Sequence, residues 1–206
     1  MTLDDIENFI RGISGAVGLT TLVVALWQGL WRGSRRPPGR TLGNARILQT
    51  PFLLSFTVFY IGLCIVLWRP VPFSISASLR VAALIVGALL YFPGLALYLW
   101  GARTLGPMFR TSSSLAVRLN AGQKLITSGP FAFVRHPMYL GLQAVAIGGL
   151  LIFWNWTFVF IAVNFLGLFI RARREEQALA AEFGQAWEVY AGQVPAWIPR
   201  FRRKGK

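Results

Sequence analysis

The sequence has few charged residues and few of the side chains that bind metals or form crosslinks. Only 14% of its 206 residues are charged, whereas about a quarter are charged in an average soluble domain. A soluble globular protein is therefore the wrong starting class. The chain contains one cysteine, Cys64, and one histidine, His136, so it has no disulfide framework and lacks the ligand set of a transition-metal site.

Several motifs of soluble enzymes are also missing. The sequence has no Gly-Lys-Ser/Thr phosphate loop and no serine nucleophile elbow. Gly12, Gly15 and Gly18 open an apolar run and do not follow a strand, so they indicate helix packing and exclude a soluble dinucleotide-binding fold. The apolar runs carry no acidic residue in mid-span and show no internal repeat, which argues against a transporter.

Acidic residues are scarce relative to basic ones. Seven Asp and Glu stand against 21 Lys and Arg, which gives a formal net charge of +14. Such an excess is typical of nucleic-acid-binding proteins, but here the arginines fall between long apolar runs, as they do in proteins held at a membrane surface. We therefore expect anionic membrane lipids as partners and no nucleic acid.

The apolar runs predict an all-α integral membrane protein. Residues 1–206 form one membrane domain, with three N-terminal spans within 13–100: 13–31, 51–68 and 81–100. No charge occurs from Tyr139 to Ile170, and one straight helix of that length would measure about 48 Å, against ~30 Å of hydrocarbon. Residues 139–170 must therefore fold back as a short helical hairpin that turns at 154–156. The total is about five transmembrane helices.

The positions of the basic residues predict the orientation. Short connections rich in Arg and Lys follow the first and third spans, and the other connections have few or none. We expect the N-terminus outside and the C-terminus in the cytoplasm, with 101–138 as a cytoplasmic segment and 171–206 as a cytoplasmic helix and interfacial tail. The N-terminus is acidic, so no signal peptide is expected there.

Polar side chains gather on two of these predicted cytoplasmic segments. Pro137 is well placed in a first helical turn, so His136 should cap a membrane helix, where it is either an interfacial anchor or a ligand-binding residue. Arg171 and Glu175 lie four residues apart on one helix face, close to the bilayer and to Glu176. The basic, proline-containing tail 194–204 is explained as an anchor on anionic lipid.

These residues occur in a recognisable order. The stretch from Gly129 to Gly141, with Arg-His-Pro-Met-Tyr at 135–139, is followed by a hairpin, by Arg171 to Glu176, and by Tyr190 and Val194-Pro195. This order resembles the isoprenylcysteine carboxyl methyltransferases and the related phospholipid methyltransferases. The resemblance covers roughly the last 90 residues, and it favours a functional role for His136 over an anchoring one.

The resemblance implies S-adenosyl-L-methionine as the cofactor and a lipophilic substrate that enters from the bilayer. It assigns Arg171 to catalysis and substrate binding, and Glu176 is expected beside it at the substrate. The implied cofactor-binding residues are Gln123, Lys124, Leu125, Ile126, Phe131, His136, Pro137, Met138, Tyr139 and Glu175. The chain departs from eukaryotic members at Phe131, where they have tyrosine, and at Ala116, where they have glutamine.

The leading hypothesis is carboxyl O-methylation of a prenylcysteine-like substrate. An ionised carboxylate needs no base, only a cation such as Arg171 to orient it. The alternative is N-methylation of a phospholipid amine, or methylation of another small lipophile, for which Glu176 could accept a proton. A nicotinamide-dependent membrane reductase and a non-catalytic lipid-binding protein are further alternatives. The oligomeric state is left open.

Overall fold

The computed structural model describes residues 2–27, 38–43, 50–106, 116–120, 122 and 124–199. Its elements are α1 (Leu3–Leu26), β1 (Pro38–Gly43), α2 (Thr50–Val66), α3 (Ala77–Leu105), β2 (Ala116–Asn120), the 3₁₀ helix η4 (Gly129–Ala132), α4 (Pro137–Phe153), α5 (Trp156–Phe165), α6 (Gly167–Phe183) and α7 (Gln185–Gln193).

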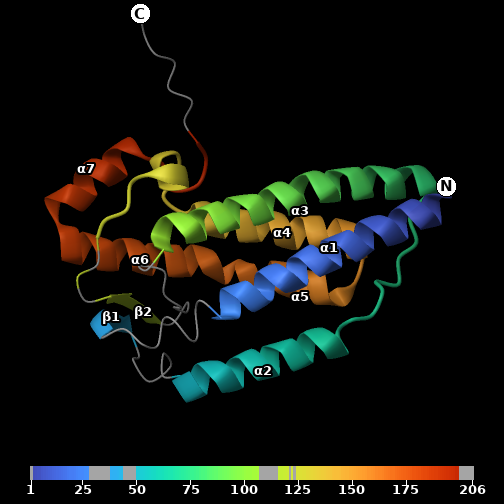
Figure 1. The fold of residues 1–206 in the computed structure, drawn as a ribbon, viewed down its shortest axis with the longest axis horizontal. Coiled ribbons are helices and arrows are strands. Elements are labelled where there is room, and N and C mark those ends of the chain that lie inside the picture. Colours follow the sequence, from blue (N-terminus) through green and yellow to red (C-terminus); the bar gives the residue numbers. More distant parts are fainter. Residues whose placement is uncertain are drawn as a thin grey trace, which may run out of the picture.

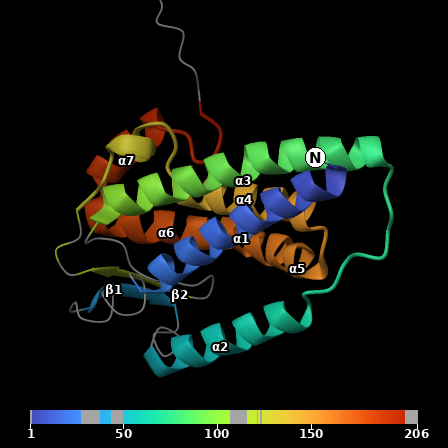
Figure 2. The same cartoon turned by 45° about the vertical axis from the view of Figure 1, so that its right-hand side comes forward.

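The helices form an elongated bundle. In Figure 1, α1, α3 and α4 run side by side along the long axis, with α5 and α6 following one another on the next layer. Helix α7 and η4 lie together at one end of the bundle, and the N-terminus lies at the other. Figure 2 shows α2 set apart from α1, as Figure 1 does. Helix α2 packs on α5, where the Tyr60 and Phe160 ring centroids are 5.1 Å apart.

Among the described residues, three stretches are long and apolar enough to cross a membrane: Leu3–Leu26, Ala77–Leu105 and Trp156–Phe183. Each of the five predicted apolar segments is helical over most of its length, but residues 54–66 and α4 are shorter apolar helices. The predicted first span begins ten residues too late, because α1 starts at Leu3 under a capping box between Thr2 and Asp5. The count of five crossings and the orientation stay predictions.

The described residues are mainly helical, as predicted, and a two-stranded antiparallel ribbon that was not predicted adds to the helices. Strand β1 pairs with β2, with Gly43 opposite Ala116 and Pro38 opposite Asn120, and the register shifts between Pro38 and Thr41. Pairing between segments more than 70 residues apart leaves no local signal in a six-residue strand that contains proline and two glycines. The ribbon lies against α6, and its strand β2 belongs to the predicted cytoplasmic segment 101–138.

The main helix contact, between α3 and α4, depends on glycines. A Cβ on Gly94 would lie 2.8 Å from the carbonyl oxygen of Gly141, and one on Gly148 would lie 2.7 Å from the carbonyl oxygen of Gly87. Real side chains do not tolerate such distances, so the two backbones approach closely only because these positions lack a Cβ. Ala144 also lines this interface, since a Cβ on Gly94 would lie 3.0 Å from the Cβ of Ala144.

The predicted turn between α4 and α5 is confirmed. Helix α4 ends at Phe153, and Trp154 adopts the left-handed conformation with φ of 50°. The Asn155 side chain then accepts a hydrogen bond from the Phe158 backbone nitrogen at 3.1 Å and caps α5. This turn reverses the chain, so that α5 and α6 run back toward the beginning of α4.

A charged cluster joins α1, α3 and α4 at the end of the bundle where the N-terminus lies. The buried guanidinium of Arg80 donates to both carboxylate oxygens of Glu7, at 3.0 and 2.7 Å, and to the carbonyl oxygens of Leu151 and Ile152, at 2.8 and 2.6 Å. Arg11 also pairs with Glu7. Two cations thus meet the negative end of α4, and one carboxylate partly neutralises them.

Candidate active site

The N-terminus of α4 positions the first set of site residues. His136 is the N-cap of α4 and Pro137 its first residue, as the sequence predicts. Proline is favoured there because its missing N–H would have no helical partner in any case. His136, Pro137, Met138 and Tyr139 are all buried. The cap therefore places an imidazole and a phenol on one inward-facing turn.

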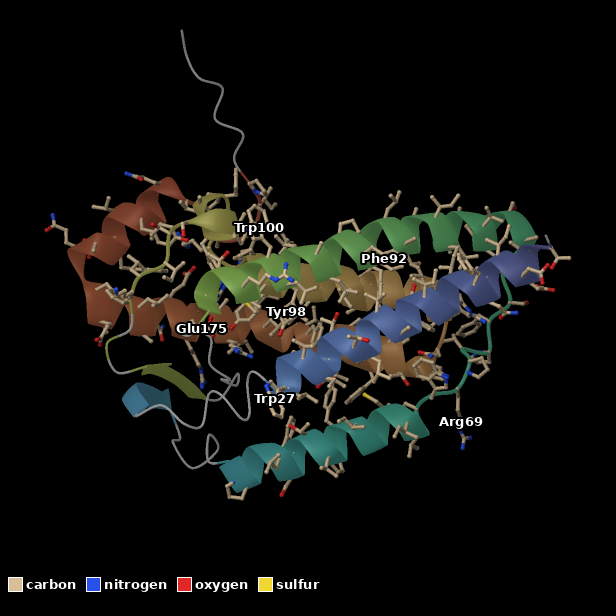
Figure 3. The ribbon with its side chains drawn as sticks, in the orientation of Figure 1. Trp27, Arg69, Phe92, Tyr98, Trp100 and Glu175 are labelled. Carbon is tan, nitrogen blue, oxygen red and sulfur yellow. The ribbon has the colours of Figure 1, made fainter. Side chains whose placement is uncertain are left out.

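Helix α6 brings Arg171 and Glu175 to this turn. The Tyr139 hydroxyl donates to Glu175 Oε1 at 2.5 Å, and Arg171 Nε donates to the same oxygen at 3.3 Å. The Arg171 guanidinium also lies over the Tyr139 ring, 5.1 Å from its centroid. The side chains of Arg171 and Glu175 are only 19% and 25% exposed, so this ion pair is far better shielded than a surface pair. Figure 3 shows Glu175 near the end of the bundle opposite Arg69.

Glu176 serves a second, neighbouring set of contacts. Its Oε1 accepts a hydrogen bond from Arg135 Nε at 2.9 Å and lies 2.9 Å from His136 Nε2. A carboxylate accepts only, so the imidazole must carry its proton on Nε2 in this contact. The two adjacent acids on α6 thus have different partners. Glu175 contacts Arg171 and Tyr139, and Glu176 contacts Arg135 and His136.

The tail beyond α7 returns to the same place. The backbone nitrogens of Arg135 and His136 donate to the carbonyl oxygens of Pro195 and Ala196, at 2.9 and 3.2 Å. The Trp197 ring lies 5.2 Å from the His136 ring, centroid to centroid. The tail was predicted to be a lipid anchor only, so its contact with the site was missed.

The other predicted cofactor residues lie along the approach to α4. Phe131 and Met138 are buried in one cluster with Tyr98 and Ala102 of α3, and Ile126 packs against it. Leu125 is half-buried, and Lys124 is exposed. Gln123 lies outside the described residues. The structure therefore brings Ile126, Phe131 and Met138 together.

Helix α7 packs against the residues of η4 and against Arg135. The Tyr190 hydroxyl donates to the carbonyl oxygen of Phe131 at 2.7 Å. Burial raises the pKa of Tyr190 to about 12, and the nearby Arg135 cation opposes this rise. Arg135 also stacks over Trp187, 5.8 Å from its ring centroid. Both aromatic residues, Trp187 and Tyr190, are buried.

Two contributors to the site were not selected from sequence. Arg135 precedes the histidine and could have been inferred from its position in the Arg-His-Pro stretch. Trp197 sits in a tail whose alternation of apolar and basic residues suggested only a membrane anchor. No local pattern reveals that a tail residue packs on a side chain about 60 positions earlier.

The chemistry of this cluster suits a small charged ligand with a planar group. It offers two carboxylates, two guanidiniums, an imidazole and aromatic faces within one shielded region. Among the described residues, no group of three or more His, Cys, Asp or Glu side chains could hold a metal ion. The arrangement can bind cationic and anionic groups side by side.

Comparison with known proteins agrees with this geometry. Residues 83–181 match the family model described as the isoprenylcysteine carboxyl methyltransferase family. The chain is also 34% identical over 90 residues to the protein-S-isoprenylcysteine O-methyltransferase of Schizosaccharomyces pombe, an alignment covering 43% of this chain and 38% of that protein. The matched segment thus spans well under half the length of this relative. The segment that is similar to the isoprenylcysteine carboxyl methyltransferase family thus holds most of α3, all of α4 and the acids of α6.

Proposed function

We propose that the protein transfers a methyl group from S-adenosyl-L-methionine to the carboxylate of a prenylcysteine-like lipophilic substrate. The observation that carries this proposal is the cluster of Arg171, Glu175 and Tyr139, with His136 and Glu176 beside it, inside the segment that matches the family. The relative with the matching segment is named for the same reaction.

The residues fit the proposed cofactor by their chemistry. S-adenosyl-L-methionine carries an ammonium and a ribose diol, for which Glu175 offers an acceptor. It also carries a carboxylate, which needs a cation, and a sulfonium, which aromatic faces such as Tyr139 attract. When bound, it supplies an electrophilic methyl group. Glu175, held between Tyr139 and Arg171, is the acid best placed to fix its orientation.

Arg171 is proposed to orient the acceptor. Its contact with Glu175 uses Nε, one of the five donors of a guanidinium, and a bidentate fork is the natural partner of a substrate carboxylate. A carboxylate with a pKa near 3.5 is already ionised at neutral pH, so no base is required. Its oxygen bonds to the methyl carbon as the carbon–sulfur bond breaks, and no proton moves. The protein mainly has to align the two groups and exclude water.

The contacts of Glu176 argue against an amine acceptor. A phospholipid amine must lose a proton before it can be methylated, which requires a free acceptor nearby. Glu176, the residue considered for that task, instead pairs with Arg135 and His136 at 2.9 Å each. A carboxylate in this position serves to hold the wall of the site, which favours the carboxyl substrate.

The apolar helices explain why such a reaction would occur in a membrane. Three stretches of the described part of the chain are long and apolar enough to cross one, which supports an integral membrane protein. We propose that the lipophilic tail of the substrate enters from the bilayer and the cofactor from the cytoplasm. The N-terminus outside and the C-terminus in the cytoplasm remain part of this proposal.

A methyl-transfer assay with two acceptors tests the function. Purified protein in lipid nanodiscs receives tritiated S-adenosyl-L-methionine with either a farnesylcysteine analogue or phosphatidylethanolamine. We expect base-labile label on the first, because methyl esters hydrolyse in base, and none on the second. Label only on phosphatidylethanolamine would overturn the carboxyl assignment. Arg171→Ala should abolish transfer, and Arg173→Ala, an exposed arginine on the same helix, serves as the matched control.

A further inference from the structure

The segment from Val194 to Trp197 lies directly on the turn that carries His136. Two backbone hydrogen bonds join it to Arg135 and His136, and Arg135 Nη1 donates to the carbonyl oxygens of Ala191 and Val194, at 2.7 and 3.1 Å. Arg135 therefore holds this segment with both its backbone and its side chain. Three hydrogen bonds to the segment, with a fourth to Ala191 in the preceding helix α7, are more than a loosely attached lipid anchor needs.

Neighbouring tail residues face different surroundings. Ile198 is 80% exposed and is available to the membrane interface. Trp197 is half-buried, lies 4.6 Å from the Phe169 ring by centroid distance, and packs on the cluster of Tyr139, Leu168 and Ala172. The indole is thus turned toward the site, and the adjacent isoleucine is turned away from it.

The imidazole of His136 is constrained on several sides. Tyr139 stacks on it with a centroid distance of 5.6 Å and an interplanar angle of 6°, and the Trp197 ring contacts it at 5.2 Å. Rotation about the last torsion of a histidine side chain is otherwise broad, with two opposite orientations allowed. Aromatic neighbours that restrict this rotation keep Nε2 directed at Glu176.

We propose that Trp197 is a positioning residue that holds the imidazole of His136 toward Glu176, which makes segment 194–197 a wall of the cofactor site. This inference rests on the proposed function for the identity of the ligand. The contact itself rests on the ring geometry and hydrogen bonds given above. The affinity for a charged nucleoside thioether, which is the product that the proposed methyl donor leaves, should therefore depend on Trp197.

The test uses the full chain in nanodiscs with ¹⁵N-labelled histidine. Because His136 is the only histidine, its two ring nitrogens give the whole histidine signal. The spectra are recorded at about pH 9, well above the ordinary histidine pKa of about 6.5. A neutral ring held in one tautomer gives two well-separated nitrogen signals, and a ring that exchanges rapidly between its two tautomers gives averaged ones. Binding of S-adenosylhomocysteine is measured on the same samples by calorimetry.

Three substitutions separate positioning from simple folding. Trp197→Leu fills space without an aromatic face, and it should move the two ring signals toward their average and weaken binding about three- to ten-fold. Trp197→Phe should restore both properties. Ile198→Ala, the exposed neighbour, should match the wild type.

Each outcome decides the proposal. A Trp197→Leu protein with wild-type ring signals, or with altered signals but unchanged affinity, would overturn it. Should the wild type fail to bind S-adenosylhomocysteine, the proposed function fails. The ring signals of the leucine and phenylalanine variants then still decide whether Trp197 positions His136.

Discussion

Arg80→Ala should be the most destabilising substitution of a single charged residue at the end of the bundle remote from the candidate site. Arg80 makes four hydrogen bonds, two to Glu7 and two to the carbonyl oxygens of Leu151 and Ile152. It therefore ties α1 and α3 to the end of α4. Truncation removes all four contacts at once and leaves acceptors in a region with little access to water.

The expected loss can be bounded from these contacts. Breaking a buried ion pair by removing one partner costs about 3–5 kcal/mol, since the other charge is left uncompensated. Arg11 still pairs with Glu7 at 2.7 Å and donates to the carbonyl oxygen of Ile152, so the value should fall near the lower limit, about 3 kcal/mol. For a chain of this size that corresponds to a decrease in Tm of about 6–12 °C.

Thermal unfolding in detergent, followed by circular dichroism, measures this change. Arg173→Ala removes an exposed arginine and should stay within about 0.5 kcal/mol of the wild type. Glu7→Gln keeps an oxygen that can accept hydrogen bonds and removes the charge. Its loss of unfolding free energy should therefore be smaller than that of Arg80→Ala. An Arg80→Ala protein as stable as the Arg173→Ala control would refute the reasoning.

Two further substitutions test the packing. Gly148→Leu should force α3 and α4 apart and cost at least about 1–3 kcal/mol, because its Cβ would lie 2.7 Å from Gly87 oxygen, whereas Gly62→Leu meets open space and should cost much less in the same unfolding assay. Tyr190→Phe should cost about 1–2 kcal/mol by leaving the Phe131 carbonyl unpaired. Because the folded-state pKa of Tyr190 is raised to about 12, its contribution is complete below about pH 10 and is lost toward pH 12. Between about pH 10 and pH 12 the free energy of unfolding should therefore fall more steeply with pH for the wild type than for Tyr190→Phe. Equal pH dependence in the two proteins would contradict this assignment.

Features with local causes were predictable from sequence. Pro137 can begin a helix but not continue one from His136, so the start of α4 was located correctly. The reversal near Trp154 was also predictable, because the uncharged run 139–170 is too long for a single membrane span.

Features that depend on distant partners were not predictable. Arg80 and Glu7 lie 73 positions apart, and nothing near either residue indicates the other. The pairing of β1 with β2 and the packing of Trp197 on His136 have the same character. At the candidate site, sequence identified Arg171 with Glu175 because they are helical neighbours, and it missed that Glu176 would contact Arg135 and His136.

The central claim is that the cluster around Glu175 binds S-adenosyl-L-methionine. Calorimetric titration of the purified protein with S-adenosylhomocysteine tests it most directly, with Glu175→Gln as the variant and Glu182→Gln, an exposed acid on the same helix, as the control. We predict binding by the wild type and the control, and at least about ten-fold weaker binding by Glu175→Gln, a loss of about 1.4 kcal/mol. Absence of heat with S-adenosylhomocysteine, together with heat from a reduced nicotinamide, would contradict the account and favour a reductase.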